Sequence, residues 1–582
     1  MKIFLGILIF FLVFGWLALL FSAVGLFYVG TIVLSILAAA TLVALYLPKI
    51  SQNIDLKLGK IFFLVIFVSL LVSFATCYFA TPTVFGGRDQ GSIGTAAIYL
   101  SQNHSLEIQN PIARDLFKKY GPGRALNFPG FDYTKNGDLI SRFPLGYTAY
   151  LASTYTLAGL KGIQYANFVP LFFFLVIFWL ILKEVFDEKI SFLGFLIAAT
   201  FFPFLWFAKY ALTETYMLFL ASTGILFLVY YSRQHKNVFF WLALATFALS
   251  ALVRIEGIVF FFLAAIYVIL LQRKKAITLP KNFKKYLLVS SLVLLGLYAY
   301  LNFPDLVDSS KNLVKAFLPN SAKESAPSAN LYSYLARIFF NYNITAYIVL
   351  GLAGILWLAK SPHRRSAEKA ETKNWPKPEF LMIFITFPAF LYLMSPMITL
   401  DEPWLLRRFV FAVFPTLIFY SIYFLNKFFY HKIFLYFVLV VLIATNGVVA
   451  WRFFTLSENK DLLPQIERIS QKFNADDLIL VDRLATGSGF SLASEPLRTL
   501  YGKQAVYFMS VDDLGYIDQG RYKNIYLIAP SPDENSWYAD LIKDKPFDIQ
   551  LITNNFLEPS DKKYALAVNV ESKDFVGIWK IK

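Results

Sequence analysis

Acidic and basic side chains stand at the edges of several long apolar segments, where charged residues are uncommon. Residues 86–91 have the sequence Gly-Gly-Arg-Asp-Gln-Gly and follow an apolar run closely. Arg88 and Asp89 form an ionisable pair, which costs free energy to hold beside the hydrocarbon region of a membrane and therefore indicates function. A solvated turn that caps a helix would also explain this stretch. We therefore interpret the pair together with the charges at the ends of the other apolar runs.

Three further junctions between apolar runs carry charges of both signs. They hold Lys209 and Glu214; Arg254 and Glu256; and Asp401, Glu402, Arg407 and Arg408 beside Trp404. Each junction also has a structural explanation. Glu214 could favour a helix N-terminus, Arg254 and Glu256 could form a local ion pair, and the two neighbouring arginines could anchor a membrane interface. If all these charges lie on one side of the membrane, a single site explains them better.

The chemistry that fits such a set is glycosyl transfer from an activated lipid. A carboxylate can act as general base toward an acceptor hydroxyl, and Asp89 is the candidate. Arginine offers a fixed fork of donors that matches phosphate oxygens. Arg407, Arg408 or Lys209 could therefore meet the charge of a phosphate leaving group. If the transfer inverts the anomeric carbon, one base is sufficient.

Composition places these junctions in a membrane protein. The chain has 582 residues, of which 57% are hydrophobic and 16% charged, with a mean hydropathy of +0.56. A net charge of +16 would suggest nucleic acid for a soluble chain, but Lys and Arg gather in short loops, as in cytoplasmic loops of membrane proteins. The single cysteine, Cys77, excludes a disulfide framework and a cysteine-based zinc site.

Thirteen segments approach the length of about 20 apolar residues that a transmembrane helix needs. They are residues 3–22, 27–47, 60–80, 163–183, 190–208, 213–231, 238–253, 257–272, 285–303, 344–360, 379–397, 406–425 and 432–452. The first segment lacks a convincing signal-peptide cleavage site, so we expect it to be retained. Residues 146–160 are short and rich in Tyr, Thr and Gly. We expect them to form an interfacial or re-entrant helix, because another crossing would invert every later loop.

Basic residues predict the orientation of these segments. The loops after the second, sixth, eighth, tenth and twelfth segments carry Lys and Arg clusters. All of these loops are cytoplasmic if the N-terminus is inside. The two longer segments 81–143 and 304–343, and all the charged junctions above, are then external. The second is rich in Pro, Ser and Asn, and we expect it to be an irregular loop that could cover a site. We therefore expect a multi-pass protein of the plasma (inner) membrane with a cytoplasmic N-terminus.

Residues 457–582 show the patterning of a soluble α/β domain. We predict a helix at 463–473, and strands at 477–482, 524–529, 547–553, 564–570 and 575–581. Gly487-Ser488-Gly489 is a lone glycine turn, too weak a motif for nucleotide binding. The predicted fold is a mainly α polytopic membrane protein of about 13 transmembrane helices with a small extracytoplasmic α/β domain. Its parts are a two-helix extension (1–59), a transmembrane catalytic domain (60–456) with the external loop 81–143, and the C-terminal domain.

In their order and topology these features resemble the GT-C superfamily of membrane glycosyltransferases, which includes protein O-mannosyltransferases and aminoarabinose transferases of lipid A. The resemblance covers roughly residues 60–455. It rests on Arg88-Asp89-Gln90-Gly91, Arg142-Phe-Pro144-Leu-Gly146-Tyr147, Leu212-Thr213-Glu214, Arg254-Ile-Glu256-Gly257 and Pro403-Trp404 with Arg407-Arg408. The chain departs from the pattern in its two preceding helices, and in having Arg88-Asp89 where the family often has paired acids.

The resemblance implies a hexosyl- or pentosyltransferase that moves a sugar, with inversion, from a polyprenyl-phosphate donor to an extracytoplasmic acceptor. Asp89 would be the catalytic base and Glu214 a second acid near the donor or a metal. The expected substrate-binding residues are Arg88, Lys209, Arg254, Glu256, Trp404, Arg407 and Arg408. A divalent cation such as Mg or Mn stays open. The expected partners are the lipid donor, the membrane, and a glycan, lipid or protein acceptor, with no nucleic acid.

The main alternative is a lipid-linked glycan transporter or flippase. Such a transporter would show charges near the centres of its spans, broken helices and repeated halves. Here the notable charges stand at the ends of spans, and the sequence has no evident repeat. A sensor or scaffold that acts through residues 457–582 is a third hypothesis, which we favour less because that region has no recognisable catalytic constellation.

Overall fold

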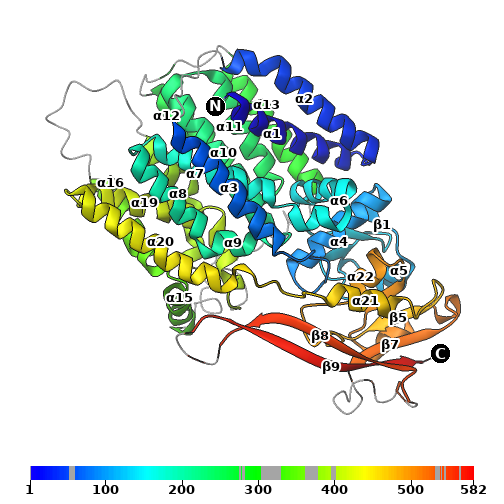
Figure 1. Ribbon diagram of the computed structural model, residues 1–582. Helices are drawn as coiled ribbons and strands as arrows, with labels where there is room; N and C mark the ends of the chain where they lie inside the picture. Colours follow the sequence, from blue (N-terminus) through cyan, green and yellow to red (C-terminus); the bar gives the residue numbers. More distant parts are fainter. Residues whose placement is uncertain are drawn as a thin grey trace.

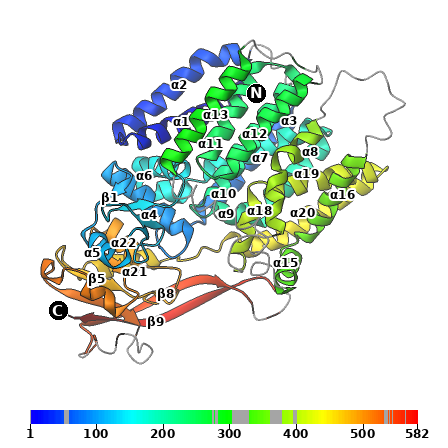
Figure 2. The same ribbon diagram turned by 180° about the vertical axis from the view of Figure 1, so that it is seen from behind.

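The computed structural model describes residues 2–51, 59–273, 277, 282–302, 329–360, 378–394, 401–530, 538, 541–542, 545–560, 562 and 565–581. Within them, a large bundle of helices is followed by a mixed α/β region. Figure 1 shows the C-terminal sheet at one end of the bundle, and the reverse view in Figure 2 shows the same arrangement. Residues 81–143, which the sequence predicts to be external and which we call the external loop, lie between the two in Figure 1.

Seven described helices are long and apolar enough to cross a membrane. They are α1 (Lys2–Ala23), α2 (Val29–Ser51), α3 (Lys60–Tyr78), α10 (Thr213–Gln234), α12 (Glu256–Arg273), α13 (Phe283–Leu301) and α20 (Lys432–Phe454). The number rises to as many as 11 if each of four bent helix pairs counts as one span. The chain is therefore a multi-pass membrane protein by helix length and composition.

The four bent pairs and two shorter apolar helices account for the other predicted spans. The pairs are α6 (Leu145–Tyr165) with α7 (Phe168–Lys183), α8 (Glu188–Thr200) with α9 (Phe202–Ala208), α15 (Ala329–Asn341) with α16 (Thr345–Lys360), and η3 (Trp404–Leu406) and α18 (Arg407–Val410) with α19 (Val413–Phe428). The shorter helices are α11 (Asn237–Ala251) and α17 (Pro378–Thr386) continued by η2 (Phe387–Leu393). The exact number of 13 stays a prediction.

Two segments that we predicted as continuous spans are broken in the structure. The segment 190–208 bends by 50° between α8 and α9. Phe201 has extended backbone there, and Pro203 follows in the first turn of α9, where proline is tolerated. The segment 406–425 bends by 65° because Ala412, with φ −144°, leaves the helical region. Residue type alone does not reveal the second break.

Residues 146–160 lie in α6, which meets α7 at an angle of 58°. Gly159 has φ +57°, so the helix is kinked at a residue that accepts a left-handed backbone. The first half of α6 is buried and packs against α4 (Asp89–Asn103). This geometry fits either a broken span or a re-entrant segment, and the choice between them stays a prediction.

The external loop folds into a small unit of its own. It holds α4, α5 (Pro111–Tyr120) and a four-stranded antiparallel sheet in the order β1-β4-β3-β2. The strands are β1 (Glu107–Ile108), β2 (Gly123–Arg124), β3 (Phe131–Tyr133) and β4 (Leu139–Ser141). Helix α5 begins where the Asn110 side chain accepts a hydrogen bond from the Ala113 amide and Pro111 takes the first helical position.

The C-terminal region contains a five-stranded sheet in the order β6-β5-β7-β9-β8. Strands β5 (Leu478–Val481), β6 (Gln504–Tyr507) and β7 (Ile525–Pro530) are parallel, whereas β8 (Asp548–Glu558) and β9 (Val568–Lys580) form a long antiparallel pair. Helices α21 (Leu462–Ser470) and α22 (Ser494–Thr499) accompany them. The predicted strands at 564–570 and 575–581 were wrong as separate elements, because β9 continues through the charged residues between them.

The expected irregular segment 304–343 can be judged only at its end. Residues 303–328 lie outside the described residues, and Ala329–Asn341 forms α15 instead of irregular chain. Most of the basic loop residues at 274–281 and 361–377 are likewise outside them. In Figure 1 the long strands β8 and β9 reach from the C-terminal sheet toward α15, where the Asn341 side chain donates to the Ala565 carbonyl at 2.9 Å.

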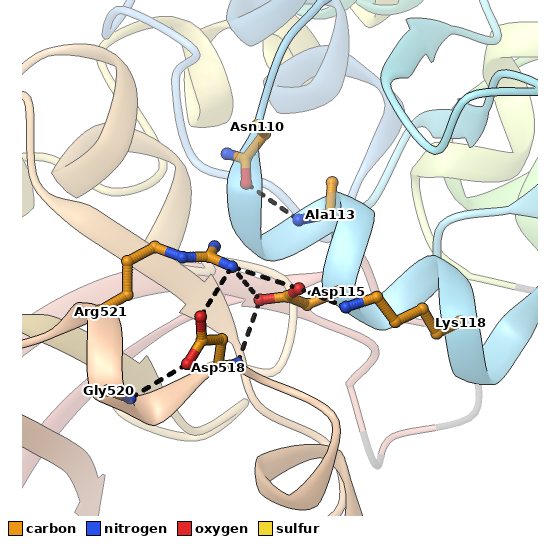
Figure 3. Close-up of polar contacts among 7 residues, drawn as sticks. All are labelled: Asn110, Ala113, Asp115, Lys118, Asp518, Gly520 and Arg521. Carbon is orange, nitrogen blue, oxygen red and sulfur yellow. Dashed lines mark hydrogen bonds and ion pairs between the residues drawn. The ribbon is translucent and has the colours of Figure 1, made fainter.

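The external loop and the C-terminal region share one hydrophobic core. Its members include Tyr99, Ile112, Phe128, Phe131 and Leu139 from the loop and Leu478, Val506, Leu527 and Trp579 from the C-terminal sheet. Polar contacts join the same surfaces. Asp115 of α5 accepts hydrogen bonds from the Asp518 amide and from Lys118, and pairs with Arg521 at 3.1 Å, as Figure 3 shows. The loop and the C-terminal region are therefore one folded unit beside the helices.

Candidate active site

Asp89 is the first residue of α4, directly after the N-cap residue Arg88. The start of this helix lies tightly against the chain that precedes it. A Cβ atom on Gly91 would come within 1.4 Å of the Phe85 carbonyl oxygen, and one on Gly94 within 2.1 Å of the Thr83 carbonyl oxygen. These two glycines let the first turns of α4 pack on residues 83–86, which fixes the position of Asp89.

The Asp89 carboxylate meets Arg407 at the start of α18. The distance from Arg407 Nη2 to Asp89 Oδ2 is 2.6 Å, and 44% of the Asp89 side chain is exposed. Burial raises the pKa of Asp89, but the charge and hydrogen bond of Arg407, with the charges of Arg408 and Arg254, bring it below its ordinary value. Asp89 is therefore an ionised, partly open carboxylate beside a cationic wall.

Arg407 and Arg408 keep unused donors. The Nε atoms of both are buried and have no hydrogen-bond partner among the described residues. Arg408 forms no ion pair within the part of the chain that the structure describes; its guanidinium carbon lies 5.8 Å from the centre of the Tyr392 ring. A guanidinium with a buried Nε and no carboxylate partner is costly unless an anion joins it. The pair is thus suited to a phosphate.

The side chain of Arg88 has different partners from that of its neighbour Asp89. Its Nη2 lies 2.6 Å from Asp401 Oδ2, and its guanidinium is held between the Trp404 ring at 4.6 Å and the Phe490 ring at 4.2 Å. Trp404 also packs on Tyr210. These contacts therefore hold the residue before Asp89 against the segment that leads to Arg407.

A second group of charges is closed around Arg254. We define the Arg254 cluster as Thr213, Glu214, Arg254, Glu256 and Tyr392. Arg254 pairs with Glu214 at 2.9 Å and with Glu256 at 2.8 Å, and 13% or less of each side chain is exposed. Arg254 also donates to the Thr213 hydroxyl, and the Tyr392 hydroxyl donates to Glu256. The cluster therefore links α10, α12 and η2, and its Tyr392 ring contacts Arg408.

Lys209 lies elsewhere, contrary to the expected substrate contact. Its ammonium donates to the carbonyls of Phe453, Phe454 and Leu456, at 2.9 Å for the first and 2.8 Å for the last. These carbonyls belong to the last turn of α20 and the residues that follow, where a cation is favourable. All three ammonium donors are used there, so we assign Lys209 a structural role.

A divalent cation does not fit this arrangement of carboxylates. Within the described residues, no group of three or more His, Cys, Asp or Glu side chains is placed to hold a metal ion. Asp89 faces Arg407, and both Glu214 and Glu256 face Arg254. A cation at either place would meet a guanidinium, so we derive no step through a metal.

Some of the charges at the four sequence junctions form two groups. Asp89 meets Arg407 beside Arg408. Glu214 and Glu256 meet Arg254. Arg88 pairs with Asp401 instead, and Lys209 lies apart. The sequence did not identify Tyr392, which lies inside an apolar run with no charged neighbour. It also missed the packing role of Gly94, for which Gly91 and Gly94 at helical spacing were the available signal.

No protein-family profile and no curated protein matches the chain. Solved structures do resemble it. The oligosaccharyltransferase of Archaeoglobus fulgidus, in complex with Zn and sulfate, has a TM-score of 0.47 and 12% identity, over 82% of this chain and 69% of that one. The same organism's AglB, with an inhibitory peptide and a dolichol-phosphate, has a TM-score of 0.44 and 12% identity, over 82% and 71%.

ArnT from Cupriavidus metallidurans, bound to undecaprenyl phosphate, has a TM-score of 0.45 and 10% identity, over 88% of this chain and 97% of that one. These structural neighbours are GT-C glycosyltransferases. Likenesses of this size carry no information on the chemistry of this chain.

Proposed function

We propose that the protein is an integral membrane glycosyltransferase that moves a sugar from a polyprenyl-phosphate donor to an extracytoplasmic acceptor, with inversion. The observation that supports this most directly is a partly exposed carboxylate beside two arginines whose Nε donors have no hydrogen-bond partner among the described residues. Asp89 lies 2.6 Å from Arg407, and Arg408 beside it has no carboxylate among the described residues. A general base and an anion site are thus adjacent.

In the proposed reaction the donor phosphate binds Arg407 and Arg408, which frees Asp89 to face the acceptor. Asp89 takes the proton of the acceptor hydroxyl while the hydroxyl oxygen forms a bond to the anomeric carbon. The bond from that carbon to the phosphate oxygen breaks on the opposite side, and the phosphate leaves with the electron pair. The two guanidinium groups stabilise the negative charge that develops on it.

The Arg254 cluster has a positioning role in this proposal. Arg254 is saturated by Glu214 and Glu256, so it is not a free phosphate ligand. Its charge, together with that of Arg408, helps to keep Asp89 ionised. We therefore assign Glu214 and Glu256 to the support of the cationic wall, and we do not assign either of them a proton-transfer step.

The test is donor consumption by the purified full-length protein in nanodiscs, with a panel of undecaprenyl-phosphate sugars. We expect the wild type to cleave at least one donor and Asp89→Asn to lose that activity. The matched control is Asp138→Asn, which removes a carboxylate from another ion pair of the same loop, with Arg114 at 2.8 Å. Equal turnover by wild type and Asp89→Asn would remove Asp89 as the base.

The four bent helix pairs give the transporter hypothesis one specific observation, because broken helices are common around transporter sites. Donor consumption, combined with a transport measurement in sealed vesicles, separates the two functions. A flippase would move the intact lipid-linked sugar across a vesicle membrane and leave the sugar–phosphate bond uncut. Cleavage that depends on Asp89 supports the transferase, whereas movement without cleavage supports the transporter.

A further inference from the structure

A cavity of about 370 Å³ lies next to Arg88, between the external loop and the C-terminal region. It is lined by Arg88 and Gln90 of the external loop, by Tyr210, and by Glu458, Phe490 and Ser491 of the C-terminal region. Arg88 precedes Asp89 in the chain, so the cavity adjoins the proposed base. The arginines for the donor phosphate, Arg407 and Arg408, are not among its lining residues.

The wall from the C-terminal region is fixed to the residues before Asp89. The Leu492 amide donates to the Gly86 carbonyl at 3.2 Å, which makes a short antiparallel bridge. Gly87 has φ +93°, and a Cβ there would lie 2.8 Å from the Phe490 carbonyl oxygen. Only glycine allows this close approach without strain. The segment that contains Gly487-Ser488-Gly489 is therefore built into the site.

One polar group on this wall has no partner. Gln90 is 7% exposed, and its buried Oε1 accepts no hydrogen bond from any described residue. A buried amide oxygen that lacks a donor costs free energy, and a ligand donor would remove that cost. Gln90 follows Asp89 directly in α4, so a glycan bound here would reach the proposed base by extending past Gln90 to the neighbouring face of the helix.

The one cationic side chain among the described residues that line the cavity is already paired. Arg88 lies 2.6 Å from Asp401. Burial raises the pKa of Glu458, whereas the charge of Arg88 and the Leu557 amide that donates to this carboxyl lower that pKa. The cavity thus offers no unpaired guanidinium to a phosphate.

The remaining surface combines ring faces with hydroxyl and amide groups. Phe85, Tyr210, Phe490 and Phe556 supply the rings, and Thr81, Asn459, Ser488 and Ser491 supply the polar groups. Phe490 is 45% exposed although it packs on Arg88. Aromatic rings can pack against the apolar face of a ligand, and the neighbouring hydroxyl and amide groups can donate and accept hydrogen bonds. This combination matches a ligand that carries hydroxyl groups around an apolar ring.

We propose that this cavity binds the acceptor, and that the acceptor is a neutral, hydroxyl-rich glycan segment held by Gln90 and Phe490. The inference rests on the proposed transferase function, since it assigns the second substrate of the same site. It gives the C-terminal region a direct part in choosing the substrate. The donor phosphate and the acceptor then occupy opposite sides of Asp89.

The test uses protection of a single introduced thiol in full-length protein in nanodiscs. Leu484→Cys places a thiol on the cavity wall, at a side chain that is 50% exposed, whereas the native Cys77 is fully buried. The probes are neutral trisaccharides (maltotriose, mannotriose, galactotriose and chitotriose), inorganic phosphate and spermidine. We expect at least one trisaccharide to slow maleimide labelling of Leu484→Cys about fivefold or more, at millimolar concentration. Phosphate and spermidine should not slow it.

Two variants complete the test. Tyr516→Cys, at a site of the C-terminal region that is 45% exposed and does not line the cavity, should label at one rate with every probe. Adding Gln90→Leu to Leu484→Cys should remove the protection, and Gln90→Asn should retain part of it. Protection by no trisaccharide, or equal protection with and without Gln90→Leu, would overturn the proposal, as would protection by phosphate alone.

The readout needs no turnover, so it separates this proposal from the transferase itself. Protection should persist when Asp89→Asn is added, because Asp89 does not line the cavity. If Asp89→Asn leaves donor consumption intact, the catalytic proposal fails while sugar protection still reports a glycan site. If donor consumption depends on Asp89 and no sugar protects, only the acceptor proposal fails.

Discussion

Arg254 and Arg408 are linked through Tyr392 but have opposite surroundings. Arg254 is enclosed by Glu214 and Glu256, with a hydroxyl at each end of the cluster. Arg408 has no carboxylate among the described residues, and its neighbour Arg407 shares the partly open Asp89. A charge whose partners lie within the protein stabilises the fold, whereas a charge without such partners is available to a ligand. Whether an arginine is paired therefore distinguishes a supporting residue from a substrate-binding residue better than its residue type does.

Arg254→Met tests the closed side and should have the largest effect on stability. It leaves two buried carboxylates without their shared cation, which typically costs about 3–5 kcal/mol. We expect a marked fall in the midpoint of thermal unfolding of the detergent-purified protein, together with loss of donor consumption. A variant that unfolds like the wild type would show that the Arg254 cluster does not support the fold.

Arg408→Met tests the open side and should give the opposite pattern. Removal of a buried guanidinium without a carboxylate should leave the unfolding midpoint unchanged or raise it. Affinity for undecaprenyl phosphate should fall by about 10- to 100-fold, as expected for the loss of charged hydrogen bonds of about 1.5–3 kcal/mol. The measurement is lipid binding beside thermal unfolding. A large loss of stability with unchanged lipid affinity would reverse our assignment of Arg408.

The pH dependence of turnover tests the coupling of Asp89 to Arg407. The proposed base acts only when ionised, so activity should fall as the pH drops through its pKa. Arg407 lowers the pKa of Asp89, so the wild-type acidic limb should lie below the ordinary aspartate value of about 3.9. In Arg407→Met the limb should move to higher pH by about one unit or more. Rates are normalised to the plateau, and an unmoved limb would exclude this coupling.

Arg114→Ala should have the smallest effect and serves as the reference for loss of an exposed ion pair. Its partner Asp138 lies in the same loop at 2.8 Å, but 49% of the Arg114 side chain is exposed. Such pairs contribute about 0–1 kcal/mol because water and salt screen them. We expect nearly wild-type unfolding and donor consumption. An effect as large as that of Arg254→Met would mean that exposure does not distinguish the two kinds of pair.

The sequence was sufficient for the membrane-spanning character and for the charged junctions, because apolar runs and isolated charges are local signals. It could not show which charges are saturated, since Glu256 meets Tyr392 and Lys209 meets the end of α20 only in three dimensions. The continuous strand β9 was hidden in the same way. Its charged residues 571–574 pair with β8 across the sheet, and that partner fixes the strand where local pattern does not.

The proposed acceptor cavity also depends on contacts that the sequence does not predict. Gly487-Ser488-Gly489 was a weak motif by itself, and nothing in its sequence indicates that it lies against Gly87. The pairing of Leu492 with Gly86 joins chain segments that only the folded protein brings together. Contacts of this kind depend on topology, which composition and periodicity do not specify.

The shared core of the external loop and the C-terminal sheet has a consequence for biosynthesis. During synthesis from the N-terminus, the loop that carries α4 is made long before the strands that cover its apolar side. The helix that begins with Asp89 therefore reaches its final packing only after the C-terminal sheet has been made. A chain that is interrupted before this sheet would hold its helices in the bilayer without completing the packing around Asp89.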